Sequence, residues 1–290
     1  MTDPEAPAAV AIVGSGAVAQ AMGRVMYVAG ARVVAVASRS RRRAADAARF
    51  IGPSVRPAAI DEVPAAASHV LIAVSDHAVS DVARLLSAAG LRQGIAVHTC
   101  GAMGPAALAP LGGGVACGVI HPLQTIREPE RAIDDLVGAY FMVCGDPLAT
   151  DWARTIAASV DGKVLEIESA RAACYHAGAV MASNALVASL DAAVRLMGLA
   201  GIDAARALPA LTPLARASVD NALAQGPARA LTGPVVRGDA ATIASHVSAI
   251  HEAPPSVREL YGAVARHLIT VARSRGLSDA SADAIEKALR

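Results

Sequence analysis

The strongest constraint in this sequence is an apolar run that meets a glycine turn and then a helix start made of small residues. The run is Val10-Ala-Ile-Val13, which is typical of a buried strand, and Gly14 and Gly16 follow directly. Gly14 permits a tight turn, Gly16 permits close approach of a pyrophosphate, and Ala19 takes the third small position. A plain glycine turn in an alanine-rich chain is the alternative. The stretch predicts a βαβ unit that binds a dinucleotide through Gly14, Ser15, Gly16, Ala17 and Val18.

The second predicted strand, residues 31–37, ends in an unusual run of hydroxyl and guanidinium groups. A protein that prefers NAD usually has a carboxylate there for the ribose hydroxyls, but this segment has none. Arginine offers a planar fork of donors that suits a phosphate, so the segment indicates a 2′-phosphate pocket and NADP(H) rather than NAD(H). A solvated basic turn is the alternative reading. The candidate residues are Ser38, Arg39, Ser40 and Arg41, with Arg39 nearest the strand end.

Composition narrows the class of protein. With 290 residues the chain is long enough for two domains, and 54% hydrophobic residues supply a substantial core. Only 2% of the residues are aromatic and the net charge is +1, which argues against a nucleic-acid partner and against a basic membrane surface. The four cysteines form no C-x-x-C pair, and the first residues lack the basic region of a signal peptide. We therefore expect a cytoplasmic protein with reduced thiols and no membrane span.

Later apolar runs complete the prediction of a mostly parallel, doubly wound α/β domain over residues 1–167. Strands are expected at residues 69–75, 94–98, 117–121, 139–144 and 163–167. Ligands in such sheets lie outside the carboxyl ends of the strands. Three strand ends therefore supply candidates: Val74 and Ser75 with His98 for the cofactor, and His121 for the reaction site. A structural role is the alternative for each histidine.

From residue 168 onward helical patterns dominate, which predicts an all-helical domain over residues 168–290. One long helix is expected from 168 to 199, with a possible bend near Gly178, and residues 202–225 are expected to form helices interrupted at Pro213. His176 and Ser183 are seven residues apart, so they lie nearly in line on the long helix, with Asn184 to one side. Buried polar groups need partners, which a cofactor and substrate would supply.

A glycine-proline loop at residues 232–239 is the second candidate in the helical domain. It offers a hydroxyl, backbone N–H groups and a cation, which suit a carboxylate substrate bound by Thr232, Gly233 and Arg237 together with Ser183 on the long helix. A structural turn before a helix capped by Asp239 explains the same residues equally well. The spacing of His98, His121 and His176 gives no metal-ligand signature, so no metal is expected.

Taken together, the two predicted domains resemble the 6-phosphogluconate-dehydrogenase-like superfamily, which includes ketopantoate reductase and pyrroline-5-carboxylate reductase. More narrowly, the segments at 121–125, 175–184 and 233–239 look like a Rossmann-like family whose C-terminal domain is of unknown function. The resemblance covers nearly the whole chain. It implies an NADP(H)-dependent oxidoreductase that acts on a small carboxylate-bearing substrate, and a homodimer formed through the helical domain.

One departure from the resembled enzymes bears on the chemistry. Ketopantoate reductases and β-hydroxyacid dehydrogenases carry a catalytic lysine on the first long helix of the second domain, whereas this chain has no lysine between Lys163 and Lys287. His176 takes that place and is the expected general acid, with Asn184 orienting the substrate and His121 lining the cleft. The expected reaction is reduction of a 2-oxo acid to a 2-hydroxy acid. The alternatives are a pyrroline-5-carboxylate-type imine reductase and a non-catalytic NADP(H)-sensing protein.

Overall fold

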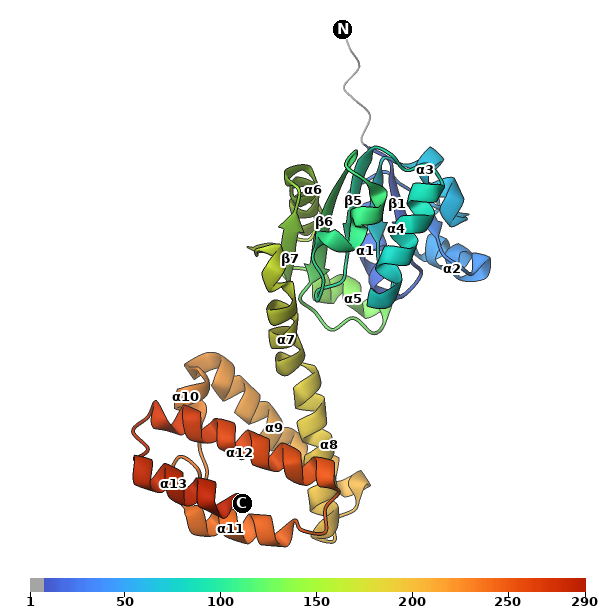
Figure 1. Ribbon diagram of the computed structural model, residues 1–290. Coiled ribbons are helices and arrows are strands. Elements are labelled where there is room, and N and C mark those ends of the chain that lie inside the picture. Colours follow the sequence, from blue (N-terminus) through green and yellow to red (C-terminus); the bar gives the residue numbers. More distant parts are fainter. Residues whose placement is uncertain (1–7) are drawn as a thin grey trace. The chain divides into compact units, whose positions relative to one another are not determined.

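The computed structural model describes residues 8–290, which separate into two units that are described here one at a time. The first unit runs to Met181 and contains all the strands of the described residues, while the second runs from Ala182 to Arg290 and is helical (Figure 1). The boundary predicted after residue 167, where the strands end, stays a prediction about how the domains divide.

The first unit is built on one eight-stranded sheet in the order β3-β2-β1-β4-β5-β6-β7-β8. Neighbouring strands are parallel except for β6 and β7, which are antiparallel. This confirms the predicted mostly parallel α/β domain followed by an all-helical region. The strands are β1 (Val10–Val13), β2 (Val33–Ala37), β3 (Arg56–Ala58), β4 (His69–Ile72), β5 (Gly94–His98), β6 (Val115–Pro122), β7 (Tyr140–Gly145) and β8 (Lys163–Glu166).

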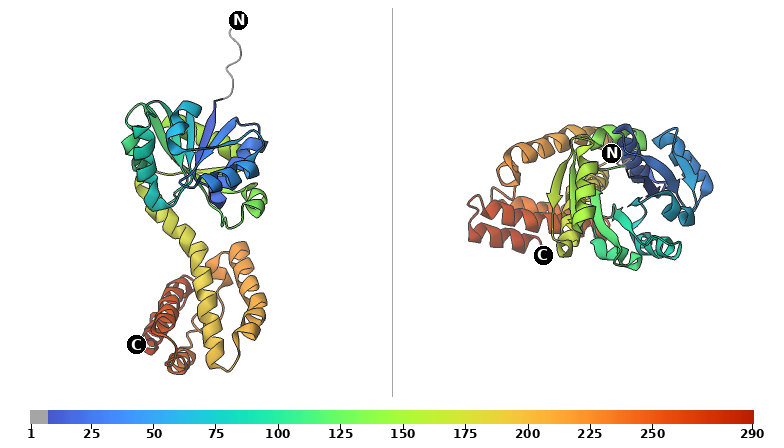
Figure 2. Two further views of the ribbon diagram at one scale, coloured as in Figure 1. Left: turned by 90° about the vertical axis from the view of Figure 1, so that its right-hand side faces the viewer. Right: turned by 90° about the horizontal axis from the view of Figure 1, so that it is seen from above.

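Helices cover both faces of this sheet and bury its central strands (Figure 1, Figure 2). One apolar cluster joins the sheet to α1 (Ala17–Val28), α2 (Arg41–Ile51), α5 (Pro129–Leu136) and α6 (Pro147–Ala158). The other joins it to α4 (Val79–Ala88) and to the 3-10 helix η3 (Pro105–Leu111). Because both faces are covered, β1 is buried along its whole length, as its continuous apolar run predicts.

The order of the strands reverses beside β1, and this places the site. The chain moves outward from β1 to β2 and β3, then returns to start β4 on the other side of β1. Between β1 and β4 the following segments diverge, which leaves a crevice at the carboxyl ends of the strands. The remaining short elements of the first unit are η1 (Ile60–Glu62), α3 (Val63–Ala66), η2 (Asp76–Ala78) and η4 (Ser169–Arg171).

The long helix predicted from residue 168 to 199 is divided. It comprises α7 (Ala172–Ala182) and α8 (Asn184–Leu199), and the interruption is at Ser183 rather than near Gly178. Ser183 leaves the helical conformation with φ −124° and ψ −72°. By length and composition, Ser169–Leu199 is the one stretch of the described helices apolar enough to cross a membrane, and its most apolar window is not buried in this chain. α8 nevertheless packs against α9 and α12, so it is an integral part of the helical unit.

The second unit has a small core. Its other helices are α9 (Ala204–Gln225), α10 (Pro227–Ala230), α11 (Ala240–Ala249), α12 (Pro255–Arg273) and α13 (Asp279–Ala288). α13 packs against both α11 and α12 around Ile243, Ile269 and Ile285 (Figure 2). The prediction of an interruption at Pro213 is wrong, because α9 continues through it. Pro213 is exposed, so water can satisfy the carbonyl group that its missing N–H leaves unpaired.

Candidate functional site

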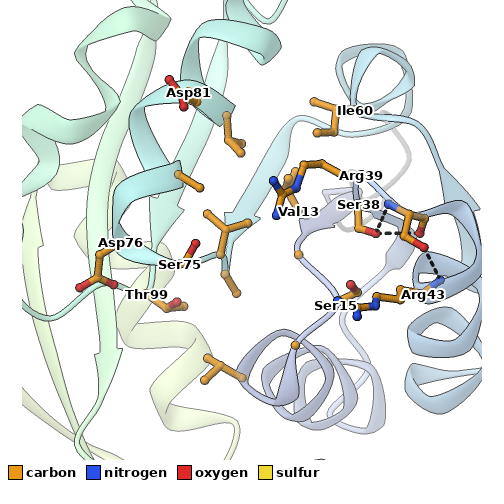
Figure 3. Close-up of a pocket in the computed structure, with 18 of the residues that line it drawn as sticks. Val13, Ser15, Ser38, Arg39, Arg43, Ile60, Ser75, Asp76, Asp81 and Thr99 are labelled. Atoms are coloured by element: carbon orange, nitrogen blue, oxygen red, sulfur yellow. Dashed lines mark hydrogen bonds between the residues drawn. The ribbon is translucent and has the colours of Figure 1, made fainter.

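A cavity of about 880 Å³ lies at the carboxyl ends of β1, β2, β4 and β5, at the crevice just described. Figure 3 shows residues from several chain segments around it, with Ser38, Arg39 and Arg43 at one end and Ser75, Asp76 and Thr99 at the other. Of the predicted cofactor residues, those that line the cavity are Gly14, Ser15, Gly16, Ala17, Val18, Ser38, Arg39, Ser40, Val74 and Ser75.

The glycine turn after β1 forms the floor of the cavity. Gly14 has φ +131°, and a Cβ added to it would stand 2.0 Å from the carbonyl oxygen of Ala73. No side chain fits there, so the turn requires glycine. Gly16 is the N-cap of α1 and has open space where a Cβ would be, and the Gln20 side-chain amide donates to the carbonyl oxygen of Ser15 at 3.1 Å. The free N–H groups of the first turn of α1 can therefore bind an anion.

The segment after β2 is held rigidly by its two serines. Ser38 Oγ donates to the carbonyl oxygen of Ser40 at 2.8 Å, and Ser40 Oγ caps α2 by accepting from the backbone N–H of Arg43 at 3.3 Å. This cap fixes the first turn of α2, and Arg39 and Arg43 both line the cavity (Figure 3). Within residues 8–290 neither arginine has a carboxylate partner. Two guanidinium groups are thus available to an anion at this end.

The structure changes one member of the predicted arginine set. Arg41 does not line the cavity, whereas Arg43 does, although the sequence analysis did not select it. The helix-capping pattern was the missed signal. With Ser40 at the N-cap, Arg43 is the third residue of the helix, one turn after the strand end that carries Arg39.

His98 does not reach the cavity, so its predicted contact with a cofactor is wrong. Its side chain is fully buried; Nε2 lies 3.1 Å from the carbonyl oxygen of Gly104, and Nδ1 accepts from the Cys100 N–H at 3.2 Å. Both nitrogens are therefore used to fold the loop after β5, and burial lowers the pKa of the imidazole. The next residue, Thr99, lines the cavity instead.

A cluster of titratable side chains lies near the Asp76 end of the cavity. His121, in β6, has its Nδ1 3.0 Å from the hydroxyl of Tyr175 on α7, and its ring centroid is 5.7 Å from that of His176. Burial lowers the pKa of His121 to about 4, repulsion from His176 acts in the same direction, and attraction by Asp76 opposes them. Burial also raises the pKa of Tyr175 to about 12. At neutral pH this pair is an uncharged imidazole and an uncharged phenol.

The structure thus brings His121 and His176 close together and adds Tyr175, while the catalytic roles of the two histidines stay predictions. Tyr175 is the neighbour of His176 on the polar stretch of the long helix but is not among the predicted site residues, because the sequence gives no sign that it faces His121. The cluster is tightly built, since a Cβ added to Gly101 would stand 2.7 Å from the His121 ring.

The other predicted substrate residues lie in the second unit. Ser183 Oγ donates to the side-chain oxygen of Asn184 at 2.9 Å. Gly233 has φ +97°, which favours glycine in the loop that also carries Thr232 and Arg237. Asp239 caps α11 as predicted, because its side chain accepts from the Thr242 N–H at 3.0 Å. The roles of Ser183, Asn184, Thr232, Gly233 and Arg237 with a substrate stay predictions.

Neither metal nor disulfide chemistry is assembled in residues 8–290. No group of three His, Cys, Asp or Glu side chains there is arranged to hold a metal ion. All four cysteines are free: Cys100 and Cys144 are buried, Cys117 is half-buried and Cys174 is exposed.

Two family comparisons agree with this architecture. Residues 4–122 match the Rossmann-like domain, and residues 139–268 match DUF2520, a domain of unknown function. The chain joins a Rossmann-like domain to a DUF2520 domain. This confirms the resemblance inferred from the segments at 121–125, 175–184 and 233–239. No curated protein matches the chain.

Solved structures share the fold over almost the whole chain. A candidate NADP oxidoreductase from Bacteroides fragilis is 21% identical with a TM-score of 0.74, covering 91% of this chain and 98% of that one. Protein TM1727 from Thermotoga maritima is 24% identical with a TM-score of 0.73, covering 92% and 99%. A reductive aminase from Aspergillus terreus, in complex with NADPH, is 20% identical with a TM-score of 0.66, covering 97% and 99%. At these identities the similarity establishes a common fold.

Proposed function

We propose that this protein is an NADPH-dependent oxidoreductase that reduces a small carboxylate-bearing substrate. The observation that carries the proposal is the cavity at the carboxyl end of the sheet, which has a glycine-only turn at its floor and two unpaired arginines at one end. Those features fit a dinucleotide with a 2′-phosphate. The structural likeness to the Aspergillus terreus reductive aminase, whose structure contains NADPH, supports the same cofactor.

Different residues would bind different parts of the cofactor. The turn from Gly14 to Val18 and the first N–H groups of α1 would hold the pyrophosphate, because backbone N–H groups at a helix start favour an anion. Ser38, Ser40 and the two guanidinium groups of Arg39 and Arg43 would hold the 2′-phosphate. When bound, the cofactor supplies a hydride. Val74, Ser75 and Thr99 form the opposite wall of the cavity and would lie beside the reactive end.

For the substrate we propose a 2-oxo acid that is reduced to a 2-hydroxy acid, as in ketopantoate reductase. In this assignment the cluster around His121 and His176 supplies the proton, Asn184 orients the substrate, and the substrate's carboxylate is bound by Ser183, Thr232, Gly233 and Arg237. The nearness of His121 to His176 and to Asp76 supports a proton-transfer site here.

A second candidate is the reduction of a cyclic imine of the pyrroline-5-carboxylate type. The observation in its favour is that the solved structures with this fold include reductive aminases and imine reductases. Reduction of a C=N bond uses the same cofactor and the same carboxylate-binding groups. The substrate's double bond therefore distinguishes the two candidates, while a protein that binds NADPH and reduces neither would be an NADP(H) sensor.

We further propose that the protein is a cytoplasmic homodimer formed through its helical unit. α8 and α9 have one buried residue each, Ala192 and Ala207, although they contain 16 and 22 residues. Leucines on their surfaces, among them Leu214 and Leu223, are largely exposed in the single chain. Two such helices need more apolar burial than this to hold their place, and a second copy can supply it. The four free thiols support a reducing compartment.

Thermal unfolding with each nicotinamide cofactor tests the cofactor assignment. Saturating NADPH is expected to raise the unfolding midpoint by several degrees, and NADH much less, because a ligand that binds only the folded state stabilises it. Replacing both Arg39 and Arg43 by alanine is expected to weaken NADPH binding by about 100-fold or more without changing NADH binding, since each charge-assisted hydrogen bond contributes roughly 1.5–3 kcal/mol. Arg42→Ala is the matched control, because Arg42 does not line the cavity.

The outcomes separate the alternatives. Equal shifts with NADH and NADPH would remove the 2′-phosphate role of the arginines, and no shift with either would overturn the oxidoreductase. NADPH consumption with ketopantoate, other 2-oxo acids and pyrroline-5-carboxylate then assigns the double bond that is reduced.

A further inference from the structure

The proposed reduction needs a proton as well as a hydride, and the structure offers two neighbouring side chains on α7 as the source. Tyr175 and His176 both lie against the ring of His121, with centroids 5.6 and 5.7 Å away. Only Tyr175 is hydrogen-bonded to it, through its hydroxyl at 3.0 Å from Nδ1. The distances to the ring therefore do not distinguish the two candidates, but the hydrogen bond of Tyr175 does.

We propose that Tyr175 is the proton donor of this reductase and that His121 is the positioning residue that holds its hydroxyl. The proposal rests on the proposed function and narrows it, because it assigns proton delivery to a residue outside the set chosen from the sequence. His176 then shapes the surroundings of the pair and is not the acid.

The location of the pair supports this assignment. Asp76 and Thr99 line the end of the cavity opposite the 2′-phosphate arginines (Figure 3). His121 and Tyr175 are not among the residues that line the cavity, but Asp76 at that end lies close enough to His121 to attract its positive charge, so the pair lies near that end. The reactive part of a bound dinucleotide lies away from its 2′-phosphate, so the phenol is on the side where a proton is needed.

The charge state of the pair also suits the role. The titratable groups that face His121 are Asp76 from η2, and Tyr175 and His176 from α7. On the neighbouring strand β7 its partner is the apolar Met142. Burial and His176 together keep the imidazole neutral at physiological pH. A neutral ring cannot donate as an imidazolium, but its Nδ1–H can support the oxygen of Tyr175. The hydroxyl hydrogen is then free to point to a substrate.

The carbonyl carbon of the substrate accepts a hydride with its two electrons from the nicotinamide cofactor, and the carbonyl oxygen accepts the proton of Tyr175. The O–H bond of Tyr175 breaks as the O–H bond of the alcohol forms, and a phenolate remains, hydrogen-bonded to His121. Water returns the proton to the phenolate before the next turnover. A phenol is a stronger acid than the alcohol formed, so this transfer runs in the favourable direction.

The local packing offers a way to move the ring without touching either residue. A Cβ on Gly101 would stand 2.7 to 2.9 Å from three atoms of the His121 ring, so the ring would have to move to accommodate it. Gly101→Ala is expected to displace His121 and lengthen its hydrogen bond to Tyr175. This variant changes the position of the imidazole while leaving the imidazole itself unchanged.

The test compares steady-state NADPH oxidation, with the best 2-oxo acid or imine substrate, in five variants, one of which is His176→Ala. Tyr175→Phe is expected to lower kcat about 100-fold or more, as the loss of a general acid does, with NADPH-induced stabilisation retained. His121→Phe and Gly101→Ala are expected to lower kcat about 10-fold with little change in KM. Tyr27→Phe is the matched control, because its hydroxyl contacts Ser54 on the far side of the unit.

Nitrogen NMR of ¹⁵N-histidine protein gives a second readout that needs no substrate. His121 is expected to show a neutral ring protonated on Nδ1 from pH 8 down to about pH 5, and to lose this preference in Tyr175→Phe. The proposal is overturned if Tyr175→Phe keeps kcat within about threefold while His176→Ala loses it, or if the ring carries its proton on Nε2. Wild-type protein that fails to bind NADPH overturns the proposed function itself, which is a different result.

Discussion

The two units of this protein bury their apolar residues to very different extents. In the first unit, β1 is buried throughout and the 11-residue helix α2 buries four residues, whereas the 22-residue α9 in the second unit buries only Ala207. The sheet collects apolar side chains on two faces, and helices close both. The helical unit instead leaves leucines such as Leu208 and Leu223 facing outward. One unit completes its core within the chain, and the other does not.

The physical reason is the size of the side chains that the helical unit uses. Alanine is the commonest residue of α9, and the one buried residue of each of these helices is an alanine, whose methyl group contributes only about 0.8 kcal/mol. Several of the larger residues of these helices, among them Val187, Leu214 and Leu223, are exposed. A helix of this length gains most of its stability from packing one face, so we infer that the face is packed in the assembly.

The largest expected effect breaks the assembly. Val187→Glu and Leu214→Glu, on α8 and α9, are each expected to lower the mass measured by light scattering from twice 29.2 kDa to 29.2 kDa, because a carboxylate cannot be buried without a partner. Leu148→Glu on α6 is the control, since Leu148 is about as exposed but lies in the first unit. A wild-type mass of 29.2 kDa at micromolar concentration would show that no second copy covers the helical unit.

The second prediction compares how much one large apolar side chain contributes to the free energy of unfolding in each unit. Phe141→Ala, at a fully buried site in β7, is expected to lower the free energy of unfolding by about 3–5 kcal/mol. Leu214→Ala is expected to lower it by about 1–3 kcal/mol, a value that depends on protein concentration, because its contacts would be made by the second copy. Urea unfolding at two protein concentrations checks both. A change below about 0.5 kcal/mol at Leu214 would mean that nothing covers this surface.

The third prediction is a pH dependence of the stability that comes from the first unit. His121 has a pKa near 6.5 when unfolded and about 4 when folded, so below pH 6.5 the unfolded state binds the proton first. Stability is therefore fully present above pH 6.5 and falls as the pH drops towards 4, by about 3 kcal/mol at 1.36 kcal/mol per pKa unit. His121→Phe is expected to reduce this loss, and exposed His251→Phe is not. An unchanged acid slope in His121→Phe would show that burial does not disfavour its charge.

Local sequence patterns were enough to predict the sheet and one end of the site. Val10–Val13 with Gly14 and Gly16 predicts the strand, the turn and the helix start, because each requirement acts within a few residues. The segment from Ser38 to Arg39 is predicted for the same reason. These positions depend on backbone conformation more than on distant contacts.

Other positions depend on contacts that sequence alone does not reveal. His98 and His121 both follow apolar runs, yet His98 turns into the loop after β5 and His121 turns to α7. Which way each points is set by the pleat of its strand and by what packs above it. The break at Ser183 and the exposure of α9 were hidden by alanine, which fits any face of a helix.

The exposed thiol of Cys174 has a practical consequence. It immediately precedes Tyr175 on α7, while two of the other three cysteines are buried and the third is half-buried. A thiol-reactive dye or spin label should therefore attach at this position in the native protein without any cysteine having to be removed or introduced. Its signal would report on the motion of α7, which carries Tyr175, and on binding near that helix as each candidate compound is added.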